Sequence, residues 1–166
     1  MSSPDREPSE PLRPSSLQEL SALVGVELGP TRWKVVDQER IDAFARDIED
    51  LQWIHVDVAR ATAERGSTIA HGMLTLSLGT SFTTELIAFD NFERAVNYGF
   101  EKVRFPEIVP VDARIRMRAC IADVAAVDGG AQARVVQTFE REDVAKPVCV
   151  AQALIRFYVS QSASAE

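Results

Sequence analysis

Apolar residues recur every four positions in the middle of the chain, between Gly72 and Leu86. This spacing keeps their side chains on one face of an α-helix, because about 3.6 residues complete each turn. We therefore predict a helix of about four turns that is largely buried along one stripe. The stripe consists of Leu74, Leu78, Phe82 and Leu86.

The second half of the chain changes to a period of two. Between residues 113 and 121 apolar side chains alternate with polar ones, which is typical of a strand with one buried face. The inward set is Ala113, Ile115, Met117, Ala119 and Ile121, and the outward set is Arg114, Arg116, Arg118 and Cys120. Asp128, Gly129 and Gly130 then form a turn signal, and we predict two further strands at about 132–140 and 147–159.

Shorter elements complete the predicted fold. Residues 31–36 and 97–104 are predicted to be extended, and Ser16 with Glu19 has the spacing of a capping box before a short helix. Asp37 is a candidate N-cap for a helix that carries Ile41 and Phe44 on one face. One long helix against an antiparallel sheet is an α+β layout.

The composition of the chain sets its expected domain boundaries. Residues 1–15 mix Pro, Ser, Glu and Arg with almost no apolar side chains, so burial cannot offset their ordering entropy. A length of 166 residues suffices for one self-supporting core. We therefore expect a disordered tail at 1–15, a single domain over 16–160 and a short C-terminal tail at 161–166.

Charge and cysteine content narrow the class of protein. A net charge of -7 argues against nucleic-acid partners, because duplex binding requires clustered Lys and Arg. No apolar run approaches the roughly 20 residues of a membrane-spanning helix, so we expect no membrane association. Cys120 and Cys149 lack metal or redox spacing, and the N-terminus does not resemble an export signal. These features predict a cytoplasmic protein.

Titratable residues are concentrated in one segment. Both histidines, His55 and His71, lie there, and Asp50 and Asp57 flank the first of them. Imidazole changes charge near neutral pH, and a nearby carboxylate can set its tautomer and basicity. We predict that this segment forms the catalytic site.

The same segment resembles a known family. Asp50, His55 and Asp57 at this spacing, followed by the run Ile69–Leu78, are similar to the MaoC-like dehydratases or R-specific enoyl-CoA hydratases, especially their NodN-like branch. The runs at 97–99, 102–106 and 109–111 are similar to that branch as well, and the resemblance spans about residues 29–158. It implies the hot dog fold, in which an antiparallel sheet wraps a long central helix, and a homodimer or higher even oligomer.

The resemblance implies a reaction and roles for particular residues. Asp50 and His55 would hold one water and hydrate a trans-2-enoyl-CoA to a (3R)-3-hydroxyacyl-CoA, and the same site would run the reverse dehydration. Attack at C3 requires a base for a water proton, and C2 must receive a proton. The Gly72 N–H would stabilise the thioester oxygen as it gains charge at a helix N-terminus. Coenzyme A would enter only as part of the substrate, and no cofactor or metal is expected.

Four further residues are candidates for supporting roles. The resemblance implies that His71 shapes the loop by hydrogen bonding, and Asp57 is expected to cap a helix at 58–63. Thr80 aligns with a serine that supports the catalytic aspartate in some relatives, although a helical threonine equally bonds its own backbone. Ser67 completes the supporting set.

Glu49 departs from the family pattern, since many relatives have glycine immediately before the catalytic aspartate. Two consequences are open. If the position needs positive φ, glutamate strains the loop; if its carboxylate lies near Asp50, it raises the pKa of that group.

Alternative functions remain. A hot dog thioesterase would carry its acid on the long helix, where Glu85 is the only candidate. A non-catalytic acyl-CoA binding domain would not need the catalytic pair of Asp50 and His55. A metal site formed by His55, Asp57 and His71 is disfavoured, because such triads usually take the distal histidine from a remote strand. The arginines of the 113–121 strand could face coenzyme A phosphates or be merely solvated.

Overall fold

The computed structural model describes residues 10–159. The predicted tails therefore lie outside the described residues at 1–9 and 161–166. Among residues 10–159, no helix combines the length and apolar character needed to cross a membrane. The elements are α1 (Leu17–Ala22), β1 (Glu27–Leu28), β2 (Lys34–Val36), α2 (Gln38–Asp47), α3 (Trp53–Val56), α4 (Val58–Arg65), α5 (Gly72–Leu86), β3 (Arg94–Arg104), β4 (Ala113–Val127), β5 (Gly130–Arg141) and β6 (Val144–Tyr158).

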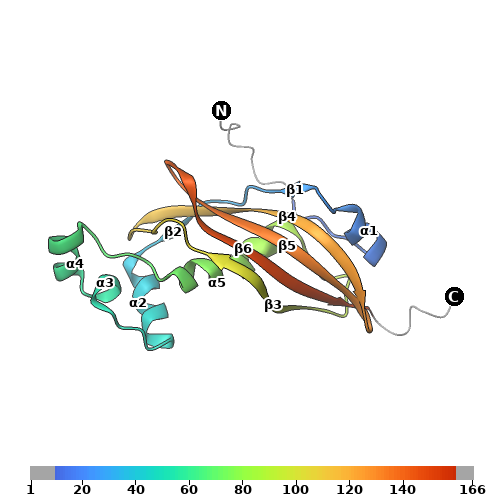
Figure 1. Cartoon of the computed structure of the whole chain (residues 1–166), viewed down its shortest axis with the longest axis horizontal. Helices are drawn as coiled ribbons and strands as arrows, with labels where there is room; N and C mark the ends of the chain where they lie inside the picture. The colour runs from blue at the N-terminus through green and yellow to red at the C-terminus, as the bar shows by residue number, and fades with distance from the viewer. Residues whose placement is uncertain (1–9, 160–166) are drawn as a thin grey trace.

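The strands form one antiparallel sheet that packs against the long helix α5. Its order is β1-β4-β5-β6-β3, and β2 also pairs with β4. Figure 1 shows α5 lying along the sheet, with α2, α3 and α4 gathered at one end of the molecule and α1 at the opposite end. The predicted α+β layout is confirmed.

The helix α5 has the bounds that its apolar spacing predicts, Gly72–Leu86. Leu74, Phe82 and Leu86 of the predicted stripe are buried, whereas Leu78 is only half-buried. The fully buried ring of Phe82 meets the ring of Phe139 on β5 edge-on, with 6.1 Å between centroids. This contact fixes the helix against the inward side chains of the sheet.

Strands β3, β4 and β5 extend beyond their predicted ranges and β6 begins earlier than predicted, whereas β2 covers only 34–36 of the predicted 31–36. In β4 the alternation predicted for 113–121 is observed, with Ile115, Met117, Ala119 and Ile121 buried. A β-bulge between Ile121 and Asp123 then breaks the period of two, although pairing with β5 continues to Val127. Two bulges in β3 have the same effect. Since an added residue reverses the side-chain alternation, these parts carry no clear strand pattern.

Residues 10–15 differ from the expectation of a tail. The backbone of Leu12 donates to Leu86 O and accepts from Ala88 N, at 2.9 and 2.8 Å, so this segment lies against the C-terminal end of α5. Arg13 also forms an ion pair with Asp90. The prediction of a disordered tail is wrong for these residues. It rested on the lack of apolar side chains, and backbone hydrogen bonds need none.

We predict that Phe82→Ala lowers the free energy of unfolding by about 3–5 kcal/mol, since it leaves a large cavity between α5 and the sheet. Urea denaturation monitored by circular dichroism measures this loss. Val58→Ala on α4 is the control, because Val58 is half exposed, and it should change stability by less than about 0.5 kcal/mol. Equal losses in the two variants would contradict the role of Phe82.

Candidate active site

The predicted catalytic residues come from the short segments between α2 and α5. The helix α2 ends at Asp47, and Glu49 then adopts φ 59°, in the left-handed region, before Asp50. A left-handed residue after a helix is usually glycine, because a side chain at Cβ is strained there. The first of the two expectations for Glu49, a strained backbone, is therefore confirmed.

His55 lies on α3 and is buried, with only 6% of its surface exposed. Its Nδ1 is 2.6 Å from the carbonyl oxygen of Ile69. A carbonyl can only accept, so Nδ1 carries the hydrogen and the neutral ring keeps a lone pair on Nε2. Burial is the main cause that lowers the pKa of His55 from its ordinary 6.5. The ring is therefore held as a neutral base.

Asp50 presents an ionised carboxylate beside this ring. Its Oδ1 accepts hydrogen bonds from Gln52 Nε2 at 3.0 Å and from Gln52 N at 3.4 Å. The Gln52 side chain is the main cause that lowers the pKa of Asp50, and the two histidines contribute in the same direction. The second expectation for Glu49, a raised pKa of Asp50, is wrong: Glu49 is not among the causes.

His71 connects the Asp50 loop to α5. Its Nε2 donates to the backbone oxygen of Asp50 at 3.1 Å, and its ring stacks on His55 with 3.6 Å between centroids. The remaining nitrogen, Nδ1, is buried and has no hydrogen-bond partner among residues 10–159. These contacts hold the strained loop in place, which is the kind of role that the family resemblance implies for this histidine.

Gly72 is the first residue of α5, so its N–H has no partner within the helix and points toward the helix N-terminus. The ring of Phe105 packs directly on it: a Cβ built on Gly72 would lie 3.0 Å from that ring. Both residues line a cavity of about 220 Å³ together with His55, Thr75 and Ile108. This cavity brings the neutral imidazole and the free N–H to the same space.

A larger cavity, of about 430 Å³, lies farther along α5 and is not lined by His55 or Gly72. Its size alone does not make it the reaction site, because His55, the candidate base, lines the smaller cavity. Thr80, predicted to support Asp50, lines the larger cavity instead.

The other supporting candidates lie near the dyad with different contacts. Asp57 accepts from Arg60 N at 3.0 Å and caps α4, which runs two residues further than the predicted 58–63. Ser67 follows α4 and is half-buried. Gln38 was missed: it donates to His55 O at 2.8 Å and joins α2 to α3. Neither Gln38 nor Gln52 stands out in the sequence, because their partners are set by the fold.

The structure brings together Asp50, His55 and His71, and one potential metal-ligand atom of each lies within 4.8 Å of the others. This cluster contains Asp50 in place of Asp57, which the sequence analysis considered together with the two histidines. The donor chemistry fits a metal poorly. A cation on His71 Nε2 would displace the hydrogen that is donated to Asp50 O, and the proton would move to a buried Nδ1 with no acceptor. The cluster is arranged for hydrogen bonding.

The thioesterase alternative requires an acid from α5 at this site, and the only acidic residue of α5 is Glu85. Glu85 lies thirteen residues after Gly72 in the sequence, about 20 Å along the helix axis. Its carboxylate is 2.7 Å from Lys34 Nζ and accepts from Arg32 N at 3.1 Å. This carboxylate is an ion-pair partner at the far end of α5.

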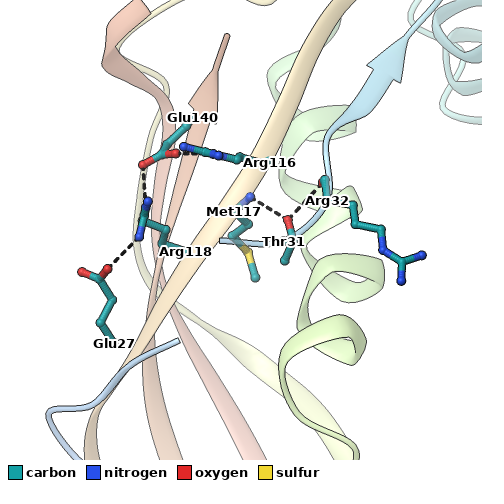
Figure 2. A network of polar contacts seen from close by, with 7 residues as sticks. All are labelled: Glu27, Thr31, Arg32, Arg116, Met117, Arg118 and Glu140. Atoms are coloured by element: carbon teal, nitrogen blue, oxygen red, sulfur yellow. Dashed lines mark hydrogen bonds and ion pairs between the residues drawn. The ribbon is translucent and has the colours of Figure 1, made fainter. Parts of the chain in front are cut away.

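The arginine row on β4 lies on the outer face of the sheet. Arg118 contacts Glu140 at 3.0 Å and Glu27 at 2.8 Å, and Arg116 contacts Glu140 at 2.7 Å, as Figure 2 shows. Arg114 pairs with Glu142 in the same way, at 2.8 Å. Acidic partners thus neutralise the row, which favours a structural interpretation over binding of coenzyme A phosphates.

Comparisons with known proteins show the family to which the chain belongs. The model of the MaoC-like domain family matches residues 19–144. A 3-hydroxyacyl-thioester dehydratase Z of Mycobacterium tuberculosis is 40% identical over 144 residues, which cover 86% of this chain and 95% of the relative. Nodulation protein N of Rhizobium meliloti is 41% identical over 111 residues, covering 65% of this chain and 69% of the relative.

Solved structures show the same fold at low sequence identity. A MaoC-like dehydratase from Rhodospirillum rubrum superposes with a TM-score of 0.72 at 16% identity, covering 87% of this chain and 97% of that one. An R-hydratase of Pseudomonas aeruginosa gives 0.67 at 19% identity, covering 82% and 83%. The predicted hot dog fold is confirmed. The chain therefore belongs to the MaoC-like domain family and is an enzyme of the hydratase or dehydratase type.

Proposed function

We propose that this enzyme hydrates trans-2-enoyl-CoA to (3R)-3-hydroxyacyl-CoA and catalyses the reverse dehydration. One observation carries the proposal: the neutral His55 ring, with its lone pair on Nε2, lies next to the ionised Asp50 carboxylate and shares a cavity with the N-terminus of α5. The named dehydratase and R-hydratase relatives support the reaction type.

The geometry suggests how protons move. A water held by Asp50 gives one proton to His55 Nε2 while its oxygen forms the bond to C3. The electron pair of the double bond passes to the thioester oxygen, where the Gly72 N–H stabilises the charge. The enolate then collapses, and C2 takes the proton back from Nε2. The sum is the addition of one water, and no cofactor takes part.

His55 thus accepts before it donates. Asp50 holds the water and stabilises the imidazolium that forms, since a nearby opposite charge favours the charged ring. This division of roles follows from the Nδ1–H bond to Ile69, which leaves Nε2 without a proton in the resting enzyme.

We also propose that the enzyme is a homodimer or a higher even oligomer. Among residues 10–159, β3 is an edge strand that pairs with β6 alone. It carries the exposed apolar side chains of Val96, Tyr98 and Phe100, and an unpaired apolar edge is a ready surface for a second copy. Sedimentation at micromolar concentration should show a dimer or larger species, and a strict monomer would contradict this proposal.

We predict that Asp50→Asn and His55→Ala each lower the hydration of crotonyl-CoA by about a hundredfold to ten-thousandfold, the usual contribution of general acid/base groups. Loss of the ultraviolet absorbance of the conjugated thioester measures the rate. Because both residues act on one water, the double variant should be little slower than either single one.

Asp57→Ala is the matched control, since Asp57 caps α4 and its loss should cost about 1 kcal/mol of stability without a comparable loss of rate. Near wild-type turnover in folded Asp50→Asn and His55→Ala would contradict the proposed chemistry and favour a non-catalytic acyl-CoA binding protein.

The rate should fall with decreasing pH as His55 becomes protonated, because the imidazolium cannot accept a proton from water. Burial lowers the pKa of His55 from its ordinary value of 6.5. The acidic limb of the pH–rate profile, where the rate falls, should therefore lie below pH 6.5. Glu49→Gly should leave the limb unchanged and stabilise the fold by about 1 kcal/mol by relieving the left-handed backbone.

Glu49→Ala separates charge from backbone strain, because alanine removes the carboxylate and keeps a Cβ. It should gain no comparable stability and should also leave the acidic limb in place. A limb that moves equally in both variants would show that the Glu49 charge acts on the dyad.

Gly72→Ala should reduce turnover by up to about a hundredfold, because the new methyl group pushes the Phe105 ring and displaces the thioester from the N–H. Stability should change little, since Phe105 is 43% exposed and its ring can shift outward. Gly72→Ala combined with Phe105→Ala should recover part of the rate. No loss of rate in Gly72→Ala would exclude close approach of the thioester at this position.

A further inference from the structure

The larger cavity is a chamber beside α5 that is partly open to solvent and is also lined by residues of β3, β5 and β6. Apolar side chains such as Leu76, Phe89 and Ile155 form much of its wall. Met73 and Leu76 line the chamber and Gly72 and Thr75 line the smaller cavity, so the two spaces border neighbouring positions of the same helix. Under the proposed function, on which this inference rests, the chamber is the space available to an acyl chain.

One residue of the chamber breaks the pattern of its strand. Gln137 lies on the inward face of β5 between Val135 and Phe139, where the alternation favours an apolar side chain, and it is 4% exposed. Its Nε2 donates to Thr83 Oγ1 at 3.2 Å, and that hydroxyl donates to Gly79 O at 2.7 Å. The hydroxyl has one hydrogen and uses it on Gly79, so the amide must turn its nitrogen toward Thr83.

This orientation presents the amide oxygen of Gln137 to the chamber. Within residues 10–159, Oε1 accepts no hydrogen bond. It is also absent from the polar atoms that are both fully buried and without a hydrogen-bond partner, so part of its surface is open. It is therefore accessible from the chamber that Gln137 lines. A buried amide oxygen that loses its hydrogen bond to water without a replacement is costly, so it discriminates between occupants of the chamber.

The helix adds further acceptors. Ser77 donates its hydroxyl hydrogen to Met73 O at 2.7 Å, and Thr84 donates to Ser81 O at 2.9 Å. Both side chains line the chamber, and both keep only lone pairs for an occupant. The side chains of Thr80 and Asn97, which also carry donors, line the chamber too. Ser77 and Thr84 are exposed, so the discrimination between occupants rests on the buried Gln137.

We propose that the chamber selects thioesters whose acyl chain carries a hydroxyl group, and that this hydroxyl donates to Gln137 Oε1. A hydroxyl also accepts, so it can take the second hydrogen of Gln137 Nε2. Gln137 is a specificity-determining residue in this proposal, and it takes no part in the hydration step.

Binding of unreactive saturated acyl-CoAs tests the proposal without relying on turnover. Isothermal titration calorimetry compares hexanoyl-, octanoyl- and decanoyl-CoA with their ω-hydroxy counterparts on the wild-type protein and on Gln137→Leu. In the wild type, at least one hydroxylated chain should bind about tenfold more tightly than its alkyl counterpart, the value of roughly one buried hydrogen bond. Gln137→Leu should abolish that ratio, and butyryl-CoA, whose chain is short, should bind both proteins alike.

Gln137→Met is a second variant of similar length with an unbranched side chain, in case leucine disturbs the core. Equal binding of hydroxylated and alkyl chains by the wild type would overturn the proposal, as would a preference that persists in both variants. Turnover of crotonyl-CoA is measured in parallel. Its absence would refute the proposed hydratase function, whereas the binding ratio alone decides the role of Gln137.

Discussion

Burial of α5 against the inward side chains of the sheet is the constraint on which the other features depend. Phe82, in the C-terminal half of α5, is fully buried and packs on Phe139, so the helix has one position relative to the strands. That position sets where Gly72 opens the first turn and which space its N–H faces. A helix held less firmly would displace the Gly72 N–H, to which the proposed mechanism assigns the stabilisation of charge on the thioester oxygen.

The loop that carries Asp50, the proposed catalytic loop, is fixed to this helix by hydrogen bonds rather than by apolar packing. His71, immediately before α5, holds the backbone of Asp50, and His55 is anchored through Ile69 O. Glu49 stores strain in the left-handed region directly before Asp50. The hydrogen bond to Ile69 O also sets the tautomer of His55, so the geometry of this segment determines which ring nitrogen can accept a proton in the proposed mechanism.

Much of this was predictable from the sequence. Four-residue spacing gave α5 its bounds, alternation gave the inward face of β4, and Asp37 and Asp57 cap the helices expected of them. Prediction failed where the pattern was interrupted, as at the bulge after Ile121, or where backbone bonds alone order a segment, as at Leu12.

Side-chain partners between distant segments were beyond sequence reasoning. The sequence does not indicate that Gln52 contacts Asp50, that Phe105 contacts Gly72 or that Gln137 contacts Thr83, because only the fold brings these pairs together. The expected effect of the Glu49 charge failed for a related reason: adjacency in the chain does not fix the direction of a carboxylate.

The central claim concerns stereochemistry at C3, and hydration of crotonyl-CoA in D₂O tests it most directly. A dehydrogenase specific for the 3R alcohol should oxidise the product, and one specific for the 3S alcohol should not. The product should carry one deuteron at C2. A 3S product or no product would contradict the account.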